Sequence, residues 1–248
     1  MRTIRIQTGH YGRTSGATGA YNPRLKIGEA QYNNLMAVEI ERIVKSLPND
    51  FNWEFVGPDE RGGTGADGFI ALHHDGSDNP AVNRPSVGYP PSSATSKGFA
   101  QVWKKRYGTI AGALDFRNDN YTRALSGYYG FSWTYSGTAD FKVVVEFEFI
   151  TADERVSWLY KNRNRLASEL IASVYEYYGV SVPKSLFGSA PAPAPAAKLQ
   201  PAPTPAPVPT PAPAPVPVPE PEVTMEDRVA KLEKNVVNLR KRIRALES

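Results

Sequence analysis

Apolar and polar residues alternate with regular periods through the first 188 residues of the chain. Stretches with the two-residue period of a strand are separated by stretches with the 3.6-residue period of a helix. We expect strands at residues 2–8, 52–56, 68–73 and 142–149, and helices at residues 27–47, 92–113 and 153–178. Strands interleaved with helices predict an α/β domain at residues 1–188, in which helices cover both faces of a sheet.

The period is lost at residues 189–222, which we interpret as a Pro/Ala-rich linker. This segment holds 14 of the 22 prolines, most of them in Pro-Ala and Pro-Val pairs. Such a run lacks the backbone donors that a helix or a sheet needs, and it favours extended polyproline II. At about 3.1 Å per residue, its ends would lie on the order of 90 Å apart. A semi-rigid spacer is the favoured interpretation, and recognition by a proline-binding partner is the alternative.

A heptad period follows at residues 223–248 and predicts a coiled-coil helix. Apolar residues alternate at spacings of four and three without a break, at Met225, Val229, Leu232, Val236, Leu239, Ile243 and Leu246. A lone helix of this length is marginal in water, so association with other copies would stabilise it. We therefore expect a homo-oligomer. β-branched residues at the a positions favour a dimer, and the repeated Arg-x-x-x-Leu-Glu pattern leaves a trimer open.

Composition excludes several classes of site and partner. The chain has no cysteine, so disulfides, thiolate zinc fingers and iron–sulfur clusters are ruled out. Its net charge of +4 is mild and not clustered, which argues against a nucleic-acid partner. No apolar run approaches the roughly 20 residues that cross a bilayer, so we expect no membrane insertion. The N-terminus alternates like a strand and lacks the apolar core of a signal peptide.

One sequence motif has the spacing of a dinucleotide-binding loop. Glycines at positions 63, 65 and 68 match the pattern literally. That motif requires a helix to begin at its end, whereas the following residues, Phe69-Ile-Ala-Leu-His, continue as a strand. The helix N-terminus that would hold a phosphate is missing, so we do not expect a nucleotide site here.

Candidate metal-binding and catalytic residues lie near the ends of predicted strands. The chain has three histidines, His10, His73 and His74, and all three follow apolar strand segments. Glu29 lies near the start of the first predicted helix and can face the same edge of the sheet. Two imidazole nitrogens and one carboxylate form the ligand set of a catalytic zinc ion. Glu146 interrupts an apolar strand, where a carboxylate is costly unless it is paired or catalytic. Ordinary surface histidines are the alternative interpretation.

These residues lie in motifs that resemble a known family. The region up to about residue 180 resembles the zinc-dependent N-acetylmuramoyl-L-alanine amidases of type 3, which occur in bacterial cell-wall hydrolases and phage endolysins. The motifs occur in the order of the family: Gly9-His10, Gly28-Glu29, Asp67-Gly-Phe-Ile-Ala-Leu-His73, and Val145-Glu146-Phe-Glu-Phe149-Ile150 followed by Asp153-Glu154-Arg155. Each motif is weak alone, and the four together are fairly specific.

The resemblance implies a fold, a reaction and residue roles. The fold implied is a mixed, mainly parallel twisted sheet with helices on both sides. His10, Glu29 and His73 would bind Zn²⁺, and Glu146 would be the catalytic carboxylate. The implied substrate is peptidoglycan, cut at the amide between N-acetylmuramic acid and L-alanine. Zinc would polarise the scissile carbonyl and lower the pKa of its water to about 7. Glu146 would accept the proton of the water and return it to the leaving amine.

The sequence departs from the family pattern at two places. The family usually has a small residue and then Asn after its second histidine, whereas His74 and Asp75 follow here. Register with the motif Phe69-Ile-Ala-Leu favours His73 as the ligand. Because adjacent strand residues face opposite ways, we do not expect both histidines to bind one metal. His74 would then contact substrate or Asp75. The aromatic residues 128–135 suggest either a substrate groove or a packed hairpin, of which the hairpin is favoured.

Three functions remain open at the level of sequence. The favoured one is a cell-wall-lysing amidase, such as a phage endolysin that leaves the cytoplasm without a signal peptide. The second is a zinc peptidase that cuts another peptide. The third is a non-catalytic cell-wall-binding or phage structural protein, although the presence of all four candidate site residues weighs against it.

Overall fold

The computed structural model describes residues 1–13, 17–61, 63, 65–79 and 81–187. The expected linker at residues 189–222 and the expected coiled coil at residues 223–248 lie outside the described residues, so both stay predictions. Among the described residues, none of the helices combines the length and the apolar character that crossing a bilayer would require.

A five-stranded sheet forms the centre of the described domain, with the strand order β4-β1-β5-β7-β6. The strands are β1 (Arg2–Thr8), β4 (Phe51–Val56), β5 (Gly68–Asp75), β6 (Ser86–Gly88) and β7 (Phe141–Phe149). The pairs β1–β4, β1–β5 and β5–β7 are parallel, and only the edge strand β6 runs antiparallel to its neighbour. The mixed, mainly parallel sheet is thus confirmed.

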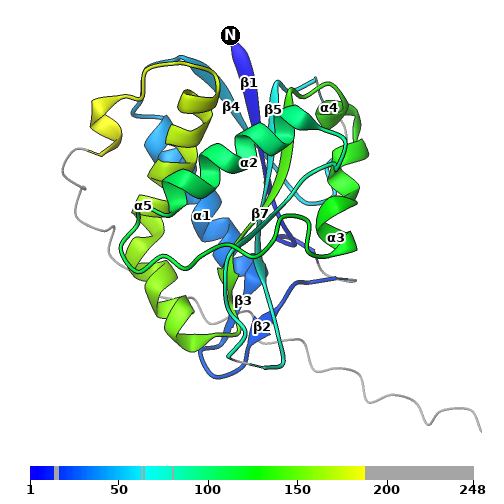
Figure 1. Cartoon of the computed structure of the whole chain (residues 1–248), viewed down its shortest axis with the longest axis vertical. Helices are drawn as coiled ribbons and strands as arrows, with labels where there is room; N and C mark the ends of the chain where they lie inside the picture. Colours follow the sequence, from blue (N-terminus) through cyan, green and yellow to red (C-terminus); the bar gives the residue numbers. More distant parts are fainter. Residues whose placement is uncertain (14–16, 62, 64, 80, 188–248) are drawn as a thin grey trace, which may run out of the picture. The chain divides into compact units, whose positions relative to one another are not determined.

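Helices cover both faces of this sheet, as expected (Figure 1). Three long helices, α1 (Glu29–Val44), α2 (Ala94–Tyr107) and α5 (Asp153–Tyr177), pack together on one face. The other face carries α3 (Arg123–Ser126), a 3₁₀ turn η1 (Tyr129–Ser132) and α4 (Thr134–Gly137). A second 3₁₀ turn, η2 (Lys184–Leu186), follows α5.

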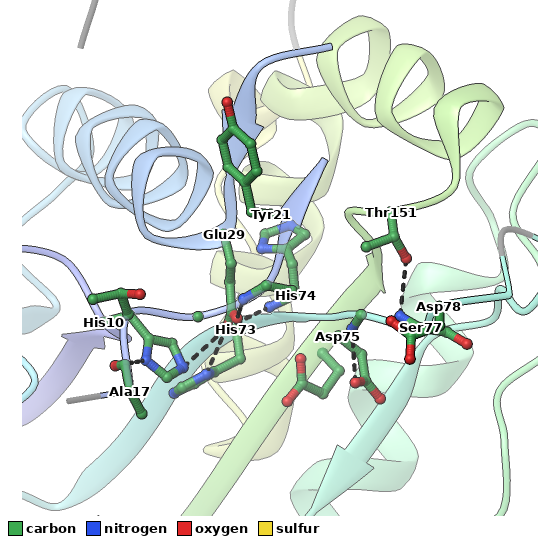
Figure 2. Close-up of a pocket in the computed structure, with 15 residues that line it drawn as sticks. His10, Ala17, Tyr21, Glu29, His73, His74, Asp75, Ser77, Asp78 and Thr151 are labelled. Atoms are coloured by element: carbon green, nitrogen blue, oxygen red, sulfur yellow. Dashed lines mark hydrogen bonds and ion pairs between the residues drawn. The ribbon is translucent and has the colours of Figure 1, made fainter. Parts of the chain in front are cut away.

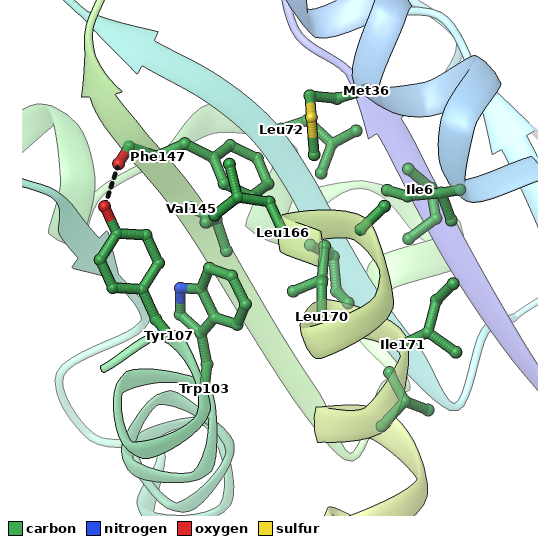
Figure 3. Close-up of a cluster of buried hydrophobic side chains, with 14 of the residues drawn as sticks. Ile6, Met36, Leu72, Trp103, Tyr107, Val145, Phe147, Leu166, Leu170 and Ile171 are labelled. Carbon is green, nitrogen blue, oxygen red and sulfur yellow. Dashed lines mark hydrogen bonds between the residues drawn. The ribbon is translucent and has the colours of Figure 1, made fainter. Parts of the chain in front are cut away.

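The strict alternation of side chains along a strand divides β5 between two cores. Ile70 and Leu72 pack under the long helices, in the core that Figure 3 shows. Phe69 and Ala71 belong to the smaller core beneath the short helices. Because successive strand residues face opposite sides, the odd-numbered residues of β5 continue toward the short helices. This alternation also sets the direction of the two histidines that follow.

The bounds of three elements differ from those that the periodicity predicts. The helix expected at residues 27–47 begins only at Glu29, because Ile27–Gly28 is extended and pairs as β3 with β2 (Tyr21–Asn22). The helix expected at residues 92–113 spans only α2, since Ser93 caps its start and Gly108 ends it. The strand expected at residues 68–73 extends to Asp75, so His73 and His74 lie inside β5.

The packed hairpin favoured for residues 128–135 is wrong. This segment forms η1 and the start of α4. Tyr128, Phe131 and Trp133 bury their rings against Phe69 and Val144. Helical turns satisfy their backbone groups locally, which lets these aromatic side chains cover the sheet without adding strands to it.

Candidate active site

The site forms where the parallel strands β5 and β7 end beside the start of α1. His73 on β5 and Glu146 on β7 are direct register partners, so their side chains share a face of the sheet. Gln7 on β1 lies on the same face, since its register partner is Ala71. In a parallel sheet the carboxyl ends of the strands converge, which brings polar residues from distant parts of the chain to one edge.

Glu29 is the first residue of α1 and is almost wholly buried, with 4% of its surface exposed. Its Oε2 accepts a hydrogen bond of 2.9 Å from the backbone N–H of Ala20. Its Oε1 lies 2.9 Å from Nδ1 of His73 and 3.4 Å from Nε2 of His10. The first turn of a helix also favours a carboxylate electrostatically. Figure 2 shows both imidazoles directed at this carboxylate.

His10 follows β1 in a tight turn and has a left-handed backbone, with φ of 60°. This conformation is uncommon outside glycine, although histidine adopts it more readily than most residues. Nδ1 of His10 donates a 2.6 Å hydrogen bond to the carbonyl oxygen of Ala17. Since Nδ1 holds the proton, Nε2 carries the lone pair, and that lone pair faces Glu29.

His73 is held by a second chain of hydrogen bonds. The hydroxyl of Tyr128 donates its single proton to Oε1 of Gln7. Its oxygen is 3.0 Å from Nε2 of His73 and therefore accepts the proton of that nitrogen. In the neutral form of His73, Nδ1 is then the nitrogen without a proton, and it faces Glu29. Burial raises the pKa of Tyr128, which keeps its phenol protonated.

The donor set fits a divalent metal ion. Nitrogen atoms of His10 and His73 and an oxygen of Glu29 all lie within 4.8 Å of one another. Both imidazoles present lone pairs to one carboxylate oxygen, an arrangement that is favourable only with a proton or a cation between these acceptors. Burial lowers the pKa of His10, which favours the neutral, metal-binding form.

Glu146 stands beside this cluster. Its Oε2 is buried, and no described residue offers it a hydrogen bond. Burial, followed by the charges of Glu29 and Asp75, raises its pKa well above the usual range. An unpaired buried carboxylate is costly, so its position next to a donor set for a cation indicates a functional role.

His74 lies on the opposite face of β5, with its imidazole fully buried beneath α1. Its ring stacks on Phe147 and meets Tyr32 edge-on, and its Nδ1 is 2.7 Å from Oδ1 of Asn33. Burial lowers its pKa to about 3, so the ring stays neutral. The structure therefore brings His73, and not the imidazole of His74, to the cluster. The imidazole of His74 contacts Asn33, and the suggested contact with substrate stays a prediction.

Two hollows meet at the cluster. One has a volume of about 800 Å³ and acidic walls formed by Glu29, Asp75, Asp78 and Glu146 (Figure 2). The other has a volume of about 500 Å³ and is bordered by apolar and aromatic residues, among them Leu125, Val144 and three tyrosines. His10, His73 and Glu146 line both hollows, so a long substrate can pass the cluster with its two ends in different surroundings.

The sequence interpretation missed two positioning contacts. Asn33 on α1 donates to the carbonyl oxygen of Gly9 at 2.9 Å and also meets His74, which ties the turn before His10 to the helix. Gln7 and Tyr128 form the chain to His73. The sequence feature that could have indicated these contacts is a polar residue among apolar ones. Gln7 follows Ile4 and Ile6 on β1, and Asn33 interrupts the apolar face of α1.

Solved structures with a similar fold include N-acetylmuramoyl-L-alanine amidases and the catalytic domain of an endolysin. The catalytic domain of CwlV, an N-acetylmuramoyl-L-alanine amidase from Bacillus (Paenibacillus) polymyxa var. colistinus, matches with a TM-score of 0.55 and 24% identity, covering 73% of this chain and 100% of that chain. The amidase AmiC2 of Nostoc punctiforme matches with a TM-score of 0.54 and 15% identity, covering 72% and 97%. The catalytic domain of the endolysin CD27L, which targets Clostridia difficile, matches with a TM-score of 0.52 and 20% identity, covering 71% and 98%.

The chain has the N-acetylmuramoyl-L-alanine amidase fold. The match covers nearly the full length of each of these three chains. The sequence itself matches no family model and no curated protein. The amidase fold is thus recognised here through its three-dimensional arrangement.

Proposed function

We propose that this protein is a zinc-dependent peptidoglycan hydrolase that cleaves the amide between N-acetylmuramic acid and L-alanine. The observation that carries the proposal is the convergence of His10, Glu29 and His73 on one point, with Glu146 beside them. This convergence occurs at the carboxyl ends of parallel strands, where α/β folds form their sites. The amidase fold supports the choice of substrate.

The residue roles follow from the chemistry of the donor set. His10 through Nε2, His73 through Nδ1 and Glu29 through a carboxylate oxygen would hold the ion. When bound, zinc supplies a Lewis acid for the scissile carbonyl and lowers the pKa of water to about 7. Hydrogen bonds orient both imidazoles, that of His10 through Ala17 and that of His73 through Tyr128, so binding the metal requires little reorganisation of the protein.

Glu146 supplies the proton transfer in this proposal. Its buried Oε2 has no partner among the described residues, which leaves this oxygen available to take a proton from the attacking water. The same oxygen then returns the proton to the leaving amine of L-alanine, because an amine is a poor leaving group unless it is protonated. The resulting products are a free lactyl carboxylate on the glycan and a peptide with an L-alanine N-terminus.

The decisive experiment is a mass analysis of the fragments released from purified peptidoglycan and from a soluble muramyl peptide. We expect intact glycan strands and peptides that begin with L-alanine. Cuts within the peptide would indicate a zinc peptidase instead, and the absence of any fragment would favour a non-catalytic wall protein. Activity should disappear with phenanthroline and return with added zinc. Full activity in metal-stripped protein would overturn the zinc assignment.

We also propose that the C-terminal segment at residues 223–248 joins copies of the chain, as a dimer or a trimer. The proposal rests on the unbroken heptad pattern of the sequence. Several catalytic domains on long arms would hold one another near an insoluble wall, because linked binders raise the local concentration.

A further inference from the structure

Tyr128 approaches the candidate metal site from the smaller core beneath the short helices. It precedes η1, on the face of the sheet opposite the long helices, and only 9% of its surface is exposed. Its ring meets the imidazole of His73 edge-on, with ring centres 5.3 Å apart. Its hydroxyl lies between Nε2 of His73 on β5 and Oε1 of Gln7 on β1.

We propose that Tyr128, anchored by Gln7, is a positioning residue that fixes which nitrogen of His73 faces the metal. This inference rests on the proposed function. Tyr128 gives its only hydrogen to Gln7, so the oxygen can serve His73 only as an acceptor. In neutral His73, the form that binds a metal, the proton must then sit on Nε2, and Nδ1 is left to face Glu29.

The direction of this chain depends on Gln7. Oε1 of an amide is an acceptor only, and Gln7 is fully buried on the interior strand β1, so it cannot turn away into solvent. Without this acceptor, the hydroxyl of Tyr128 could donate its hydrogen to Nε2, which would place the imidazole proton on Nδ1. That proton would occupy the position that a metal ion needs. Gln7 therefore selects the metal-binding form of His73 through Tyr128.

Local packing holds the phenol in place. A side chain at Gly130 would come within 2.8 Å of the Tyr128 ring, so a glycine at that position lets η1 close over the ring. The ring of the neighbouring Tyr129 packs on the ring of Tyr128, with ring centres 4.4 Å apart, a contact that Tyr129→Phe keeps. The Tyr129 hydroxyl donates to the carbonyl oxygen of Pro58 at 3.1 Å and accepts from Arg13 at 2.9 Å. Tyr129 thus provides a matched control, since it is the adjacent tyrosine and its hydroxyl does not reach His73.

The test compares zinc affinity across three variants, measured by competition with a chromophoric chelator. Tyr128→Phe keeps the ring and removes only the hydroxyl, and we expect its zinc Kd to rise roughly 10- to 100-fold. Tyr129→Phe should bind zinc as the wild-type protein does. Gln7→Met should raise the Kd as well, because it frees the Tyr128 hydrogen. Thermal unfolding of each variant verifies folding, and Gln7→Met decides the question if Tyr128→Phe is misfolded.

A spectroscopic signature separates positioning from general destabilisation. The chain has three histidines, so a ¹⁵N-histidine spectrum of the zinc-loaded, untagged protein is simple to assign. The Nε2–H proton of His73 should exchange slowly in the wild-type protein and in Tyr129→Phe. It should exchange fast in Tyr128→Phe, which lacks the acceptor.

The outcomes distinguish this inference from the proposed function. If wild-type protein binds zinc and cuts muramyl peptide, but Tyr128→Phe keeps the wild-type Kd and the slow His73 proton, the role of Tyr128 is overturned and the amidase function stands. If the wild-type protein binds no zinc, the zinc-dependent function and the role of Tyr128 are both overturned. A raised Kd together with the lost proton signal supports the inference.

Discussion

His73 and Glu146 are Cα register partners on the adjacent parallel strands β5 and β7, and their side chains leave the sheet on the same face. This pairing places a proposed metal ligand and a proposed proton acceptor one strand spacing apart, about 4.8 Å, on a rigid framework. Residues on the central strands of a sheet hold their geometry more tightly than residues on loops do. The relative position of the two groups is therefore set by strand register and not by loop conformation.

The first prediction follows from this pairing. Glu146→Gln keeps the size of the side chain and removes the proton acceptor, so turnover of a muramyl peptide should fall roughly 10²- to 10⁴-fold. Zinc content, measured by atomic emission after dialysis, should remain at the wild-type level. A loss of zinc would identify Glu146 as a ligand, and unchanged turnover would reduce it to a structural carboxylate.

The second prediction separates the two adjacent histidines. His73→Ala should abolish zinc binding, because it removes a nitrogen of the cluster. His74→Ala should retain zinc, since its imidazole packs between Tyr32 and Phe147 on the other face. It should nevertheless lower the free energy of unfolding by about 2–4 kcal/mol through the cavity that it leaves. The reverse pattern of zinc contents would show that the register of β5 differs from the one described.

The third prediction concerns the close approach of Gly9 to His73. A Cβ at position 9 would overlap Nε2 of His73 and lie 2.6 Å from the carbonyl oxygen of Leu72. Gly9→Ala should therefore displace His73, weaken zinc binding and destabilise the fold by roughly 1–3 kcal/mol. Gly28→Ala is the control: its nearest contact would be an ordinary 3.6 Å to Tyr21, and zinc titration should find its affinity unchanged.

The fourth prediction links pH to stability through Glu39, which joins α1 to α5. Burial by itself would raise the pKa of Glu39. Hydrogen bonds from Arg42 and Asn164 lower it by a larger amount, so the net pKa lies below the usual 4.5. A depressed carboxyl pKa stabilises the fold above pH 4.5, and this contribution is lost as the pH falls through the folded-state value. Glu39→Gln should thus cost about 1 kcal/mol at pH 7 and little near pH 3.

Urea unfolding followed by tryptophan fluorescence at both pH values measures this difference. Glu41→Gln, on the same helix, removes only an exposed ion pair with Lys45 and should change stability by less than about 0.5 kcal/mol. An equal effect of the two substitutions, or a Glu39 effect that persists at pH 3, would contradict the linkage.

The fifth prediction concerns oligomerisation. Sedimentation of the full chain should give a dimer or a trimer at micromolar concentration, and a chain truncated before Pro191 should be a monomer. Truncation should reduce retention on an insoluble wall more than it changes cleavage of a soluble muramyl peptide. A monomeric full chain would end the proposal for residues 223–248.

The sequence by itself determined the local structure and the identity of the residues that gather at the site. Periodicity located β1, β4, β7 and α5 within one or two residues of their ends, because side-chain period reflects which face of an element is buried. Register with the motif Phe69-Ile-Ala-Leu favoured His73 over His74, and alternation along the strand argued against both binding one metal. His10 was a candidate because it follows a predicted strand, and Glu29 because it lies near the start of a predicted helix. Glu146 was a candidate because a carboxylate inside an apolar strand is costly without a purpose.

Only the tertiary structure decided how distant segments meet. The strand order β4-β1-β5-β7-β6 brings Gln7 and Tyr128, which are 121 residues apart, into one hydrogen-bonded chain with His73. No local period encodes that contact, because it depends on how η1 folds over the sheet and not on the conformation of either segment. The same limit explains the wrong hairpin at residues 128–135: aromatic side chains favour burial in a strand and in a helical turn alike. The space left above β5 and β7 decides whether a strand or a helical turn forms, and that space is a property of the packed molecule.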